Sequence, residues 1–472
     1  MLASIVGVHL PPFVALVLTM GLIFFLFRRD IRERPNVSGA LWLPLLWMLL
    51  ACSKPVSQWL TIFGLPVSGP AVVEEGSPLD AYFYLALAIA GFCVLNKRQV
   101  ALSEVVRNNG WIIAFLFYCF VAIAWSDFPF IAFKRWIKIL GHPIMALIVL
   151  TEPDPEEALT RLMKRCAYVV IPVSMLFIKY YPQWGVYYDE WTGAQMNKGI
   201  AGGKNSLGAD CMILGFFFFW YLLQTWRTER STRRRDELRL IAGFALGIWW
   251  LLAHAHSATA TITLLVGVVM VMFVGSRFVN RNFIGTYIGV GLVLLAVAEL
   301  AFGISGELSE ALGRGSGLSG RTKLWTALLG LHTNPIFGVG FESFWLGDRP
   351  AQLEGVFFFI PNEAHNGYLE IYLNLGLIGI TILIGLFLAT YRRIRLKLFR
   401  NFEWGRYRLG FFVAVVLYNW TEAAFKTYHP LWFVFYLIAM EYPRTHSSTA
   451  EPYLGAPESE ANRDLKYAEA EL

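Results

Sequence analysis

The sequence predicts an all-α fold, a polytopic membrane protein with 12 or 13 transmembrane helices. Of the 472 residues, 56% are hydrophobic and only 16% are charged, whereas an average soluble protein carries about 25% charged residues. The mean hydropathy is +0.50. Apolar runs of about 18 residues, long enough to cross a bilayer as a helix, recur along the chain. We therefore expect one transmembrane bundle over residues 1–441 in place of several soluble domains.

The expected spans follow one another along the whole bundle. In chain order they cover 5–26, 39–53, 80–96, 110–125, 136–151, 166–180, 207–225, 240–255, 258–276, 283–303, 366–391, 409–423 and 430–441. The short last segment leaves the count open between 12 and 13.

The distribution of Lys and Arg predicts the orientation of the bundle. The arginine-rich loops 27–38, 226–239 and 392–408 fall on one side of the predicted membrane, and that side holds most of the 40 Lys and Arg residues. The positive-inside rule makes this side cytoplasmic. The N-terminus and a long loop at 304–365 are then on the outer side of the membrane. The polar tail 442–472 is expected to be disordered and cytoplasmic.

Several classes of protein do not fit this composition. The five cysteines all lie in or at the ends of apolar segments, and no CxxC or Cys/His cluster suggests a metal, so neither a metal nor another cofactor is expected. The net charge of +6 arises from the basic loops and requires no nucleic-acid partner. No internal repeat of the kind found in secondary transporters is evident.

Polar residues gather on the predicted outer face, where basic groups oppose the insertion preference and need a reason. They are Lys134, Arg135, Lys204, Asn205, His254, His256, Ser257, Arg321, His365, Glu370, Glu422 and Lys426. Lys and Arg at this depth suit a lipid-linked phosphate or diphosphate. The alternative for the lysines and for Arg135 is contact with lipid headgroups or snorkelling.

The sequence around Arg321 gives the strongest indication of an anion-binding site among these residues. Leu324, Trp325, Leu328 and Leu331 recur at helical spacing, so we expect an amphipathic surface helix with Ser319 as its N-cap. Arg321 would then lie in the first turn, where the helix dipole disfavours a cation. A bound anion would reverse that penalty.

His365 directly precedes a long apolar helix that Asn366 can cap. Its ordinary pKa near 6.5 suits proton transfer at neutral pH, but a histidine at a helix start is often structural. A contact with Glu370, about one and a half turns further on, is one arrangement that the spacing permits. Asp210 and His142, inside predicted spans, are either packing contacts or components of the site.

Three motifs in order resemble the O-antigen ligase and polymerase family of bacterial envelope glycan enzymes. They are Ser319-Gly320-Arg321 with Trp325, Asn334-Pro335 with Gly338-Val339-Gly340, and His365-Asn366-Gly367-Tyr368-Leu369-Glu370. The resemblance extends over roughly residues 200–391. Trp125-Ser126-Asp127 with Lys134-Arg135 is a further similar patch, and Gly203-Lys204-Asn205 resembles the variant found in exopolysaccharide polymerases.

The resemblance implies a C-type membrane glycosyltransferase, independent of metal and of nucleotide sugars, at the periplasmic face of the bacterial inner membrane. Its donor would be a glycan on undecaprenyl diphosphate, and its other partners the lipid bilayer and the chain-length regulator and flippase proteins of the same pathway. Arg321 would bind the diphosphate, and His365 would assist the attacking hydroxyl or orient the donor. Residues expected to bind substrate are Lys204, Asn205, Arg135, Lys134, Glu370, Glu422, His256 and Trp325.

Three functions remain open at this stage. Ligases of the family often have an arginine where this chain has Lys204, which favours a polymerase of exopolysaccharide repeat units. The alternatives are a ligase that transfers finished glycan to lipid A core or another acceptor, and a transporter of lipid-linked glycans.

Overall fold

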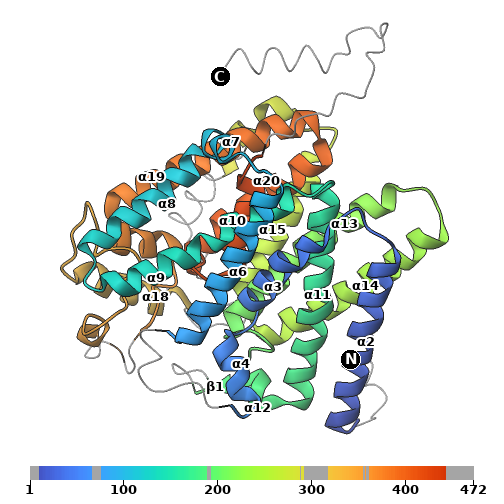
Figure 1. The fold of residues 1–472 in the computed structure, drawn as a ribbon, viewed down its shortest axis with the longest axis horizontal. Coiled ribbons are helices and arrows are strands. Elements are labelled where there is room, and N and C mark those ends of the chain that lie inside the picture. The colour runs from blue at the N-terminus through green and yellow to red at the C-terminus, as the bar shows by residue number, and fades with distance from the viewer. Residues whose placement is uncertain are drawn as a thin grey trace, which may run out of the picture.

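The computed structural model describes residues 10–65, 76–188, 193–287, 289–291, 317–353, 357 and 361–442, with the backbone alone for 317–320. The described chain is mostly helical, which confirms the predicted fold class of a polytopic helical membrane protein (Figure 1). One feature was not predicted: Val186–Tyr188 (β1) and Gln195–Asn197 (β2) form a small antiparallel hairpin.

The helices occupy most of the segments expected from hydropathy. The first part of the chain holds α2 (Pro12–Arg32), η1 (Gly39–Leu41), α3 (Trp42–Ala51), α4 (Val56–Ile62), α6 (Pro78–Lys97), α7 (Leu102–Asn108), α8 (Gly110–Val121), η2 (Ala122–Trp125), α9 (Pro129–Ile139), α10 (Gly141–Leu150), α11 (Pro155–Tyr180) and α12 (Pro182–Gly185). The second part holds α13 (Lys204–Arg227), α14 (Thr232–Ala255), α15 (Ala258–Val274), η3 (Arg281–Phe283), α18 (Gly317–Gly330), η4 (Pro350–Leu353), α19 (Gly367–Arg400), α20 (Phe402–Thr421) and α21 (Pro430–Ala439).

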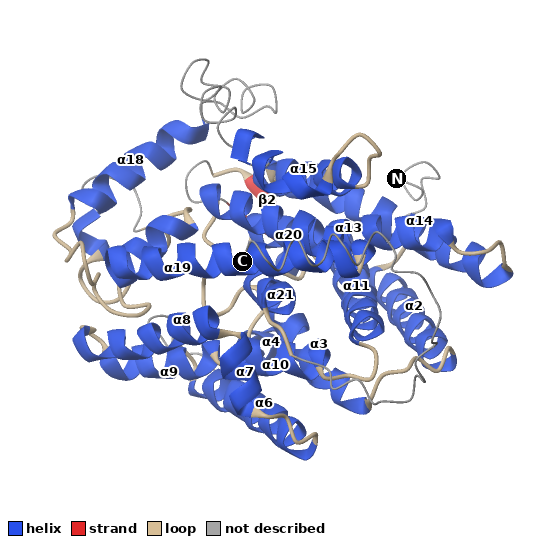
Figure 2. Ribbon diagram, turned by 90° about the horizontal axis from the view of Figure 1, so that it is seen from above, coloured by secondary structure: helices blue, strands red, loops and turns tan. Residues whose placement is uncertain are grey.

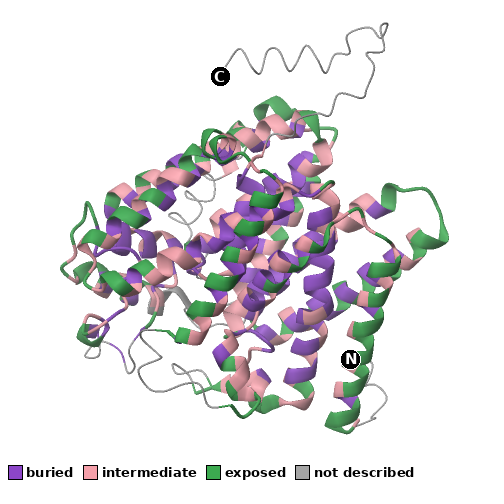
Figure 3. Cartoon of the chain, in the orientation of Figure 1, coloured by how far each residue is buried: buried purple, intermediate pink, exposed green. Residues whose placement is uncertain are grey.

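The bundle packs around α13, α20 and α21. Helix α13 packs against α14 and α15, α20 packs against α15 and α19, and α10 lies between α6 and α21 (Figure 2). Aromatic side chains such as Phe216, Phe217 and Trp432 are fully buried in this centre. Apolar residues on the outer faces of α2 and α14, including Phe24 and Leu246, are exposed, and buried residues concentrate inside the bundle (Figure 3). An exposed apolar exterior is what a lipid-facing surface requires.

Fewer helices qualify as spans than the 12 or 13 expected. Among the described residues, five helices are long and apolar enough to cross a membrane, or up to seven if each of two bent pairs counts as one span. The expected span 136–151 is divided between α9 and α10. Helix α11 begins far before the expected 166 and carries Arg161 and Arg165, paired with Asp30 of α2 at 2.8 and 2.7 Å. Most of span 283–303, the start of the loop at 304 and the tail from 443 lie outside the described residues.

The basic residues gather at one end of the bundle, which we call the basic end. Helix α14 begins at Thr232 and α19 continues to Arg400, so many arginines expected in loops lie in helix ends instead. Arginine and lysine are good helix formers, so a helix continues beyond its apolar stretch. Arg29 at the end of α2 contacts Glu237 near the start of α14 at 2.7 Å. At the end of α13, Gln224 donates to Glu403 at the start of α20.

Helix α19 is broken at Gly376, whose φ is +63°. The loop 334–344 packs into this break: Leu377 N donates to Pro335 O at 2.9 Å, and Gly340 N donates to Asn374 O at 2.9 Å. The Asn374 side chain accepts from two further backbone N–H groups of the loop, those of Ser343 and Phe344. This close backbone contact fixes the glycine-containing loop against the start of α19.

Candidate functional site

Charged side chains meet where the start of α19, the end of α20 and helix α18 come together. We call Arg321, Glu363, His365, Glu422 and Lys426 the charged cluster. His365 Nδ1 lies 2.8 Å from Glu363 Oε1 and 3.4 Å from Glu422 Oε2. Arg321 Nη2 donates to Glu422 Oε1 at 2.7 Å, and Lys426 forms an ion pair with Glu363. The cluster therefore joins residues more than 100 positions apart in the sequence.

Glu422 is the centre of these contacts. It is the C-cap residue of α20, and its backbone carbonyl accepts from Gly367 N at the start of α19, 3.1 Å away. Its buried carboxylate also accepts from Asn205 Nδ2 at 3.0 Å, which brings in the start of α13. Tyr418 OH, one turn earlier on α20, donates to the backbone carbonyl of Asn205 at 3.2 Å. Three helix ends are thus held together at one residue, Glu422.

The segment that carries His365 is fixed from both sides. Asn366 caps α19 as expected, because its side chain accepts from Tyr368 N and Leu369 N. The Trp325 indole donates to Ala364 O at 2.8 Å, and the Glu370 carboxylate accepts from Ala364 N at 2.7 Å and from the Trp345 indole. Trp325 and Glu370 therefore hold the backbone beside His365. His365 itself has a left-handed backbone, with φ at +48°.

The site lies at the opposite end of the bundle from the basic end. Helix α13 runs from Asn205 at the charged cluster to Arg227 at the basic end. A helix of this length covers about 36 Å, comparable to the thickness of a bilayer. We call this the site end.

Comparison with known proteins assigns a family to the segment that contains three residues of the charged cluster. The O-antigen ligase family model (Wzy_C) matches residues 241–384. These residues are an O-antigen ligase family domain. A search of curated proteins gives no match. Family members take part in ligase- or polymerase-type processing of polysaccharides at membranes.

The O-antigen ligase domain supplies only part of the charged cluster. Arg321, Glu363 and His365 lie inside the matched range, whereas Glu422 and Lys426 come from the segment that follows it. The sequence analysis did not identify Glu363 as a site residue. Its position two residues before His365 was the available signal, but a loop carboxylate at that spacing is common and carries no periodicity.

The neighbouring carboxylates of the charged cluster raise the pKa of His365 above the value expected from the sequence. Burial opposes the charged imidazolium, but hydrogen bonds to Glu363 and Glu422 outweigh this effect and raise the pKa of His365 to about 9. Burial also opposes the charge of Glu363, yet Lys426 and His365 hold its pKa well below the ordinary value. At neutral pH His365 is therefore a cation. The sequence-based expectation of a histidine that titrates near 6.5 is wrong for this site.

The protonated histidine leads to a pH prediction. A pKa raised in the folded state stabilises the protein fully below the unfolded value near 6.5, and this stabilisation is lost as the pH rises through about 9. The shift corresponds to on the order of 3 kcal/mol. We expect the melting temperature of the purified protein to fall between pH 6.5 and 9 more steeply than that of His365→Gln. Parallel curves for the two proteins would contradict this account.

The cluster suits an anion better than a metal ion. Within the described part of the chain, Glu363, His365 and Glu422 place potential ligand atoms within 4.8 Å of one another, so a metal is geometrically feasible. Arg321 and Lys426 already form ion pairs with these carboxylates, so a metal would have to compete with both cations and displace a proton from His365. Three cations and two carboxylates leave one net positive charge for an incoming anion.

The remaining residues expected to bind substrate are not members of the charged cluster and have contacts of their own. Arg135 of α9 donates to Glu342 O and lies 4.0 Å from the Glu342 carboxylate. Lys134 stacks over the Phe130 ring, 5.0 Å from its centroid. Lys204 begins α13 next to Asn205, with Nζ 3.7 Å from Met196 Sδ. His256 is the exposed C-cap of α14, with φ at +48°.

Two sequence expectations about local structure need revision. Helix α18 begins at Gly317, so Ser319 lies inside the helix and is not its N-cap, and Arg321 lies beyond the first turn. The charge of Arg321 is instead balanced by Glu422. His142 accepts from the Trp47 indole at 3.1 Å and contacts Thr427 O at 3.0 Å, so it acts as a packing contact between helices. Asp210 is buried within α13.

Proposed function

We propose that this protein polymerises undecaprenyl-diphosphate-linked oligosaccharide repeat units into exopolysaccharide at the periplasmic face of the bacterial inner membrane. The charged cluster is the observation that carries the proposal. It combines Arg321, protonated His365 and Lys426 with two carboxylates at the end of the bundle away from most arginines. Positive-inside orientation makes that end periplasmic.

The cations act on the donor diphosphate. Arg321 is suited to bidentate binding of phosphate oxygens, and its present partner is a single carboxylate oxygen of Glu422. A diphosphate with more than one negative charge competes well for this arginine and for the His365 imidazolium. Stabilisation of the departing diphosphate by such fixed charges is worth several kcal/mol in a site that excludes water.

Glu422 is the group that we propose receives the proton. A hydroxyl at the nonreducing end of the incoming unit attacks the anomeric carbon of the growing chain. The bond from that carbon to the diphosphate oxygen breaks, and undecaprenyl diphosphate leaves with the electron pair. Once the diphosphate has engaged Arg321 and His365, the Glu422 oxygens that contact these two residues become available to the attacking hydroxyl. The Glu422 carboxylate then accepts the hydroxyl proton.

The other expected residues complete the site around this centre. Asn205 orients Glu422, whereas Trp325 and Glu370 fix the segment that carries His365. Lys204, at the start of α13 beside Asn205, would contact the glycan or diphosphate. Lys134, Arg135 and His256 would contact more distant parts of the lipid-linked substrate. This assignment requires neither metal nor nucleotide sugar.

Glycan profiling of a deletion strain tests the proposal against its alternatives. We expect loss of the protein to leave single repeat units on undecaprenyl diphosphate at the periplasmic face, with no polymer. Accumulation of long lipid-linked chains would instead identify a ligase for lipid A core or another acceptor. Accumulation of single units at the cytoplasmic face would identify a transporter. Complementation with the wild-type gene is the control.

A further inference from the structure

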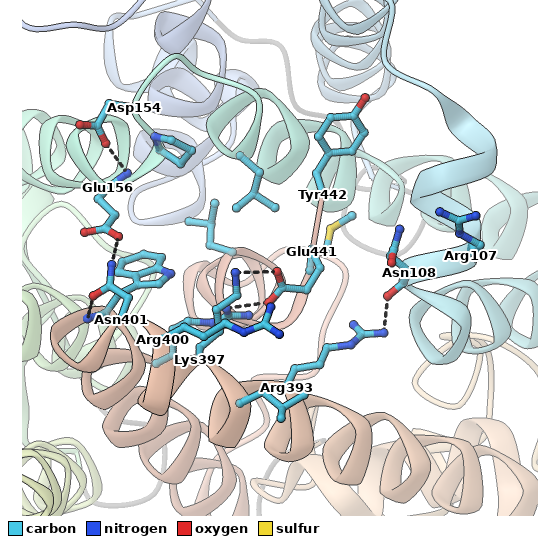
Figure 4. Close-up of a pocket in the computed structure, with 17 residues that line it drawn as sticks. Arg107, Asn108, Asp154, Glu156, Arg393, Lys397, Arg400, Asn401, Glu441 and Tyr442 are labelled. Carbon is cyan, nitrogen blue, oxygen red and sulfur yellow. Dashed lines mark hydrogen bonds and ion pairs between the residues drawn. The ribbon is translucent and has the colours of Figure 1, made fainter. Parts of the chain in front are cut away.

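The basic end of the bundle contains a cavity of about 790 Å³ that the proposed reaction does not use. It lies where the last turns of α19 face α7, the start of α11, the start of α20 and the segment after α21 (Figure 4). Arg400 at the end of α19 lines it, whereas the charged cluster lies at the opposite end of this helix, next to its first residue Gly367. The cavity is therefore separate from the candidate site.

The lining of the cavity is predominantly basic. Its cationic residues are Arg107, Arg393, Lys397, Arg400 and Arg408. Each of its three acidic residues already has a partner within the protein. Asp154 caps α11, and Glu156 accepts a hydrogen bond from Asn401 Nδ2 at 2.6 Å. Glu441 pairs with Arg408 at 2.7 Å and with Lys397 at 3.4 Å. The lining keeps two net positive charges.

Apolar side chains form the other part of the wall. They are Leu150, Leu396, Trp404, Leu437 and Met440. Figure 4 shows Arg393, Lys397 and Arg400 along α19 on one side of the cavity and Glu156 and Asn401 on another. A space with cationic groups beside apolar groups matches an anionic headgroup that is attached to hydrocarbon. A freely soluble anion would make no use of the apolar part.

We propose that this cavity binds the phosphate headgroup of an anionic phospholipid from the leaflet at the basic end. The positive-inside rule makes this leaflet cytoplasmic, and basic pockets between helices at that boundary favour acidic headgroups by about 1 kcal/mol per cation near the surface. The bound lipid joins α7, α19 and α20, and so stabilises the end of the bundle that anchors the site helices.

Two exposed arginines at the rim of the cavity, Arg107 and Arg400, allow the proposal to be tested. Arg107 forms an i,i+3 ion pair with Glu104, and its side chain is 75% exposed. Arg239, outside the cavity, forms an i,i+3 ion pair with Asp236 and is 77% exposed. Arg107→Gln/Arg400→Gln is therefore matched by the control Arg235→Gln/Arg239→Gln, in which both arginines are exposed and neither lines the cavity.

Binding of short-chain phosphatidylglycerol and phosphatidylcholine to the delipidated full-length protein is measured by native mass spectrometry. We expect wild type and the control to prefer phosphatidylglycerol by about tenfold or more, and Arg107→Gln/Arg400→Gln to lose most of this preference. Equal loss in both double variants, or no preference in wild type, would overturn the proposal. If sn-glycerol 3-phosphate displaces the lipid at equal concentration, the phosphate site stands and the lipid assignment is wrong.

Discussion

Arg321→Ala is expected to reduce polymer formation by about 100-fold or more, the loss seen when one stabilising charge is removed from a developing anion. Arg321 is the arginine of the charged cluster, and its contact with Glu422 holds it 2.7 Å from that carboxylate. Removing it takes away the proposed bidentate phosphate ligand and leaves Glu422 with one partner fewer. Arg321→Lys should recover only part of the activity, because an ammonium group cannot bind two phosphate oxygens in the same planar way.

The measurement is polymer yield and chain length in the deletion strain that carries each variant. Lys323→Ala is the matched control, since Lys323 is an exposed cation two residues away on the same helix and lies outside the charged cluster. Membrane insertion and monodispersity in detergent are checked for each variant. Polymer of near-normal length from both Arg321→Ala and His365→Ala would refute the proposed role of the cluster.

Gly376→Ala is expected to destabilise the protein by at least about 3 kcal/mol, the range of severe backbone strain combined with a clash. Gly376 has a φ of +63°, and a Cβ at this position would lie 2.2 Å from Ile336 O. The loop 334–344 would have to leave the break in α19, and its hydrogen bonds with Asn374 and Leu377 would be lost. Because the break lies close to the start of α19, displacement of the loop also disturbs the charged cluster.

Thermal unfolding of the purified protein in detergent measures this effect. Gly243→Ala is the control: Gly243 lies inside α14, and a Cβ there would meet no atom within 4 Å. Alanine has the higher helix propensity, so this variant should be as stable as wild type or slightly more stable. An equal melting temperature for Gly376→Ala and wild type would show that the backbone contact at the break is not required.

Hydropathy located most helices, because burial in lipid demands long apolar stretches with internally bonded backbone. Hydropathy predicted helix boundaries less well where charged side chains are buried inside the bundle. The span within α11 was predicted too short, because Arg161 and Arg165 appear unsuited to a membrane when the sequence is considered alone. In the structure, Asp30 of α2 pairs with both arginines. The break at Gly376 was also missed, since a glycine in an apolar run gives no sign of the loop that packs against it.

The candidate site was likewise predicted only in part. Arg321, His365, Glu422 and Asn205 were predicted from residue type and from the side of the membrane on which each should lie, and their side chains contact one another in the structure. Arg135 was grouped with them but contacts Glu342. Glu363 was not recognised, and its contact with His365 contributes to the raised pKa. A pKa depends on neighbours within a few ångströms, which linear spacing in a loop does not specify.

The sequence by itself determined that the chain is a helical membrane protein, showed a resemblance to O-antigen ligases in its second half, and predicted which face would carry its polar residues. These properties follow from composition, apolar run length, charge asymmetry and short motifs, each of which is local in the sequence. Only the tertiary structure decided that Glu422 joins the starts of α13 and α19, and that His365 is a cation. Both depend on contacts between segments far apart in the chain, where distance sets the strength of the interaction.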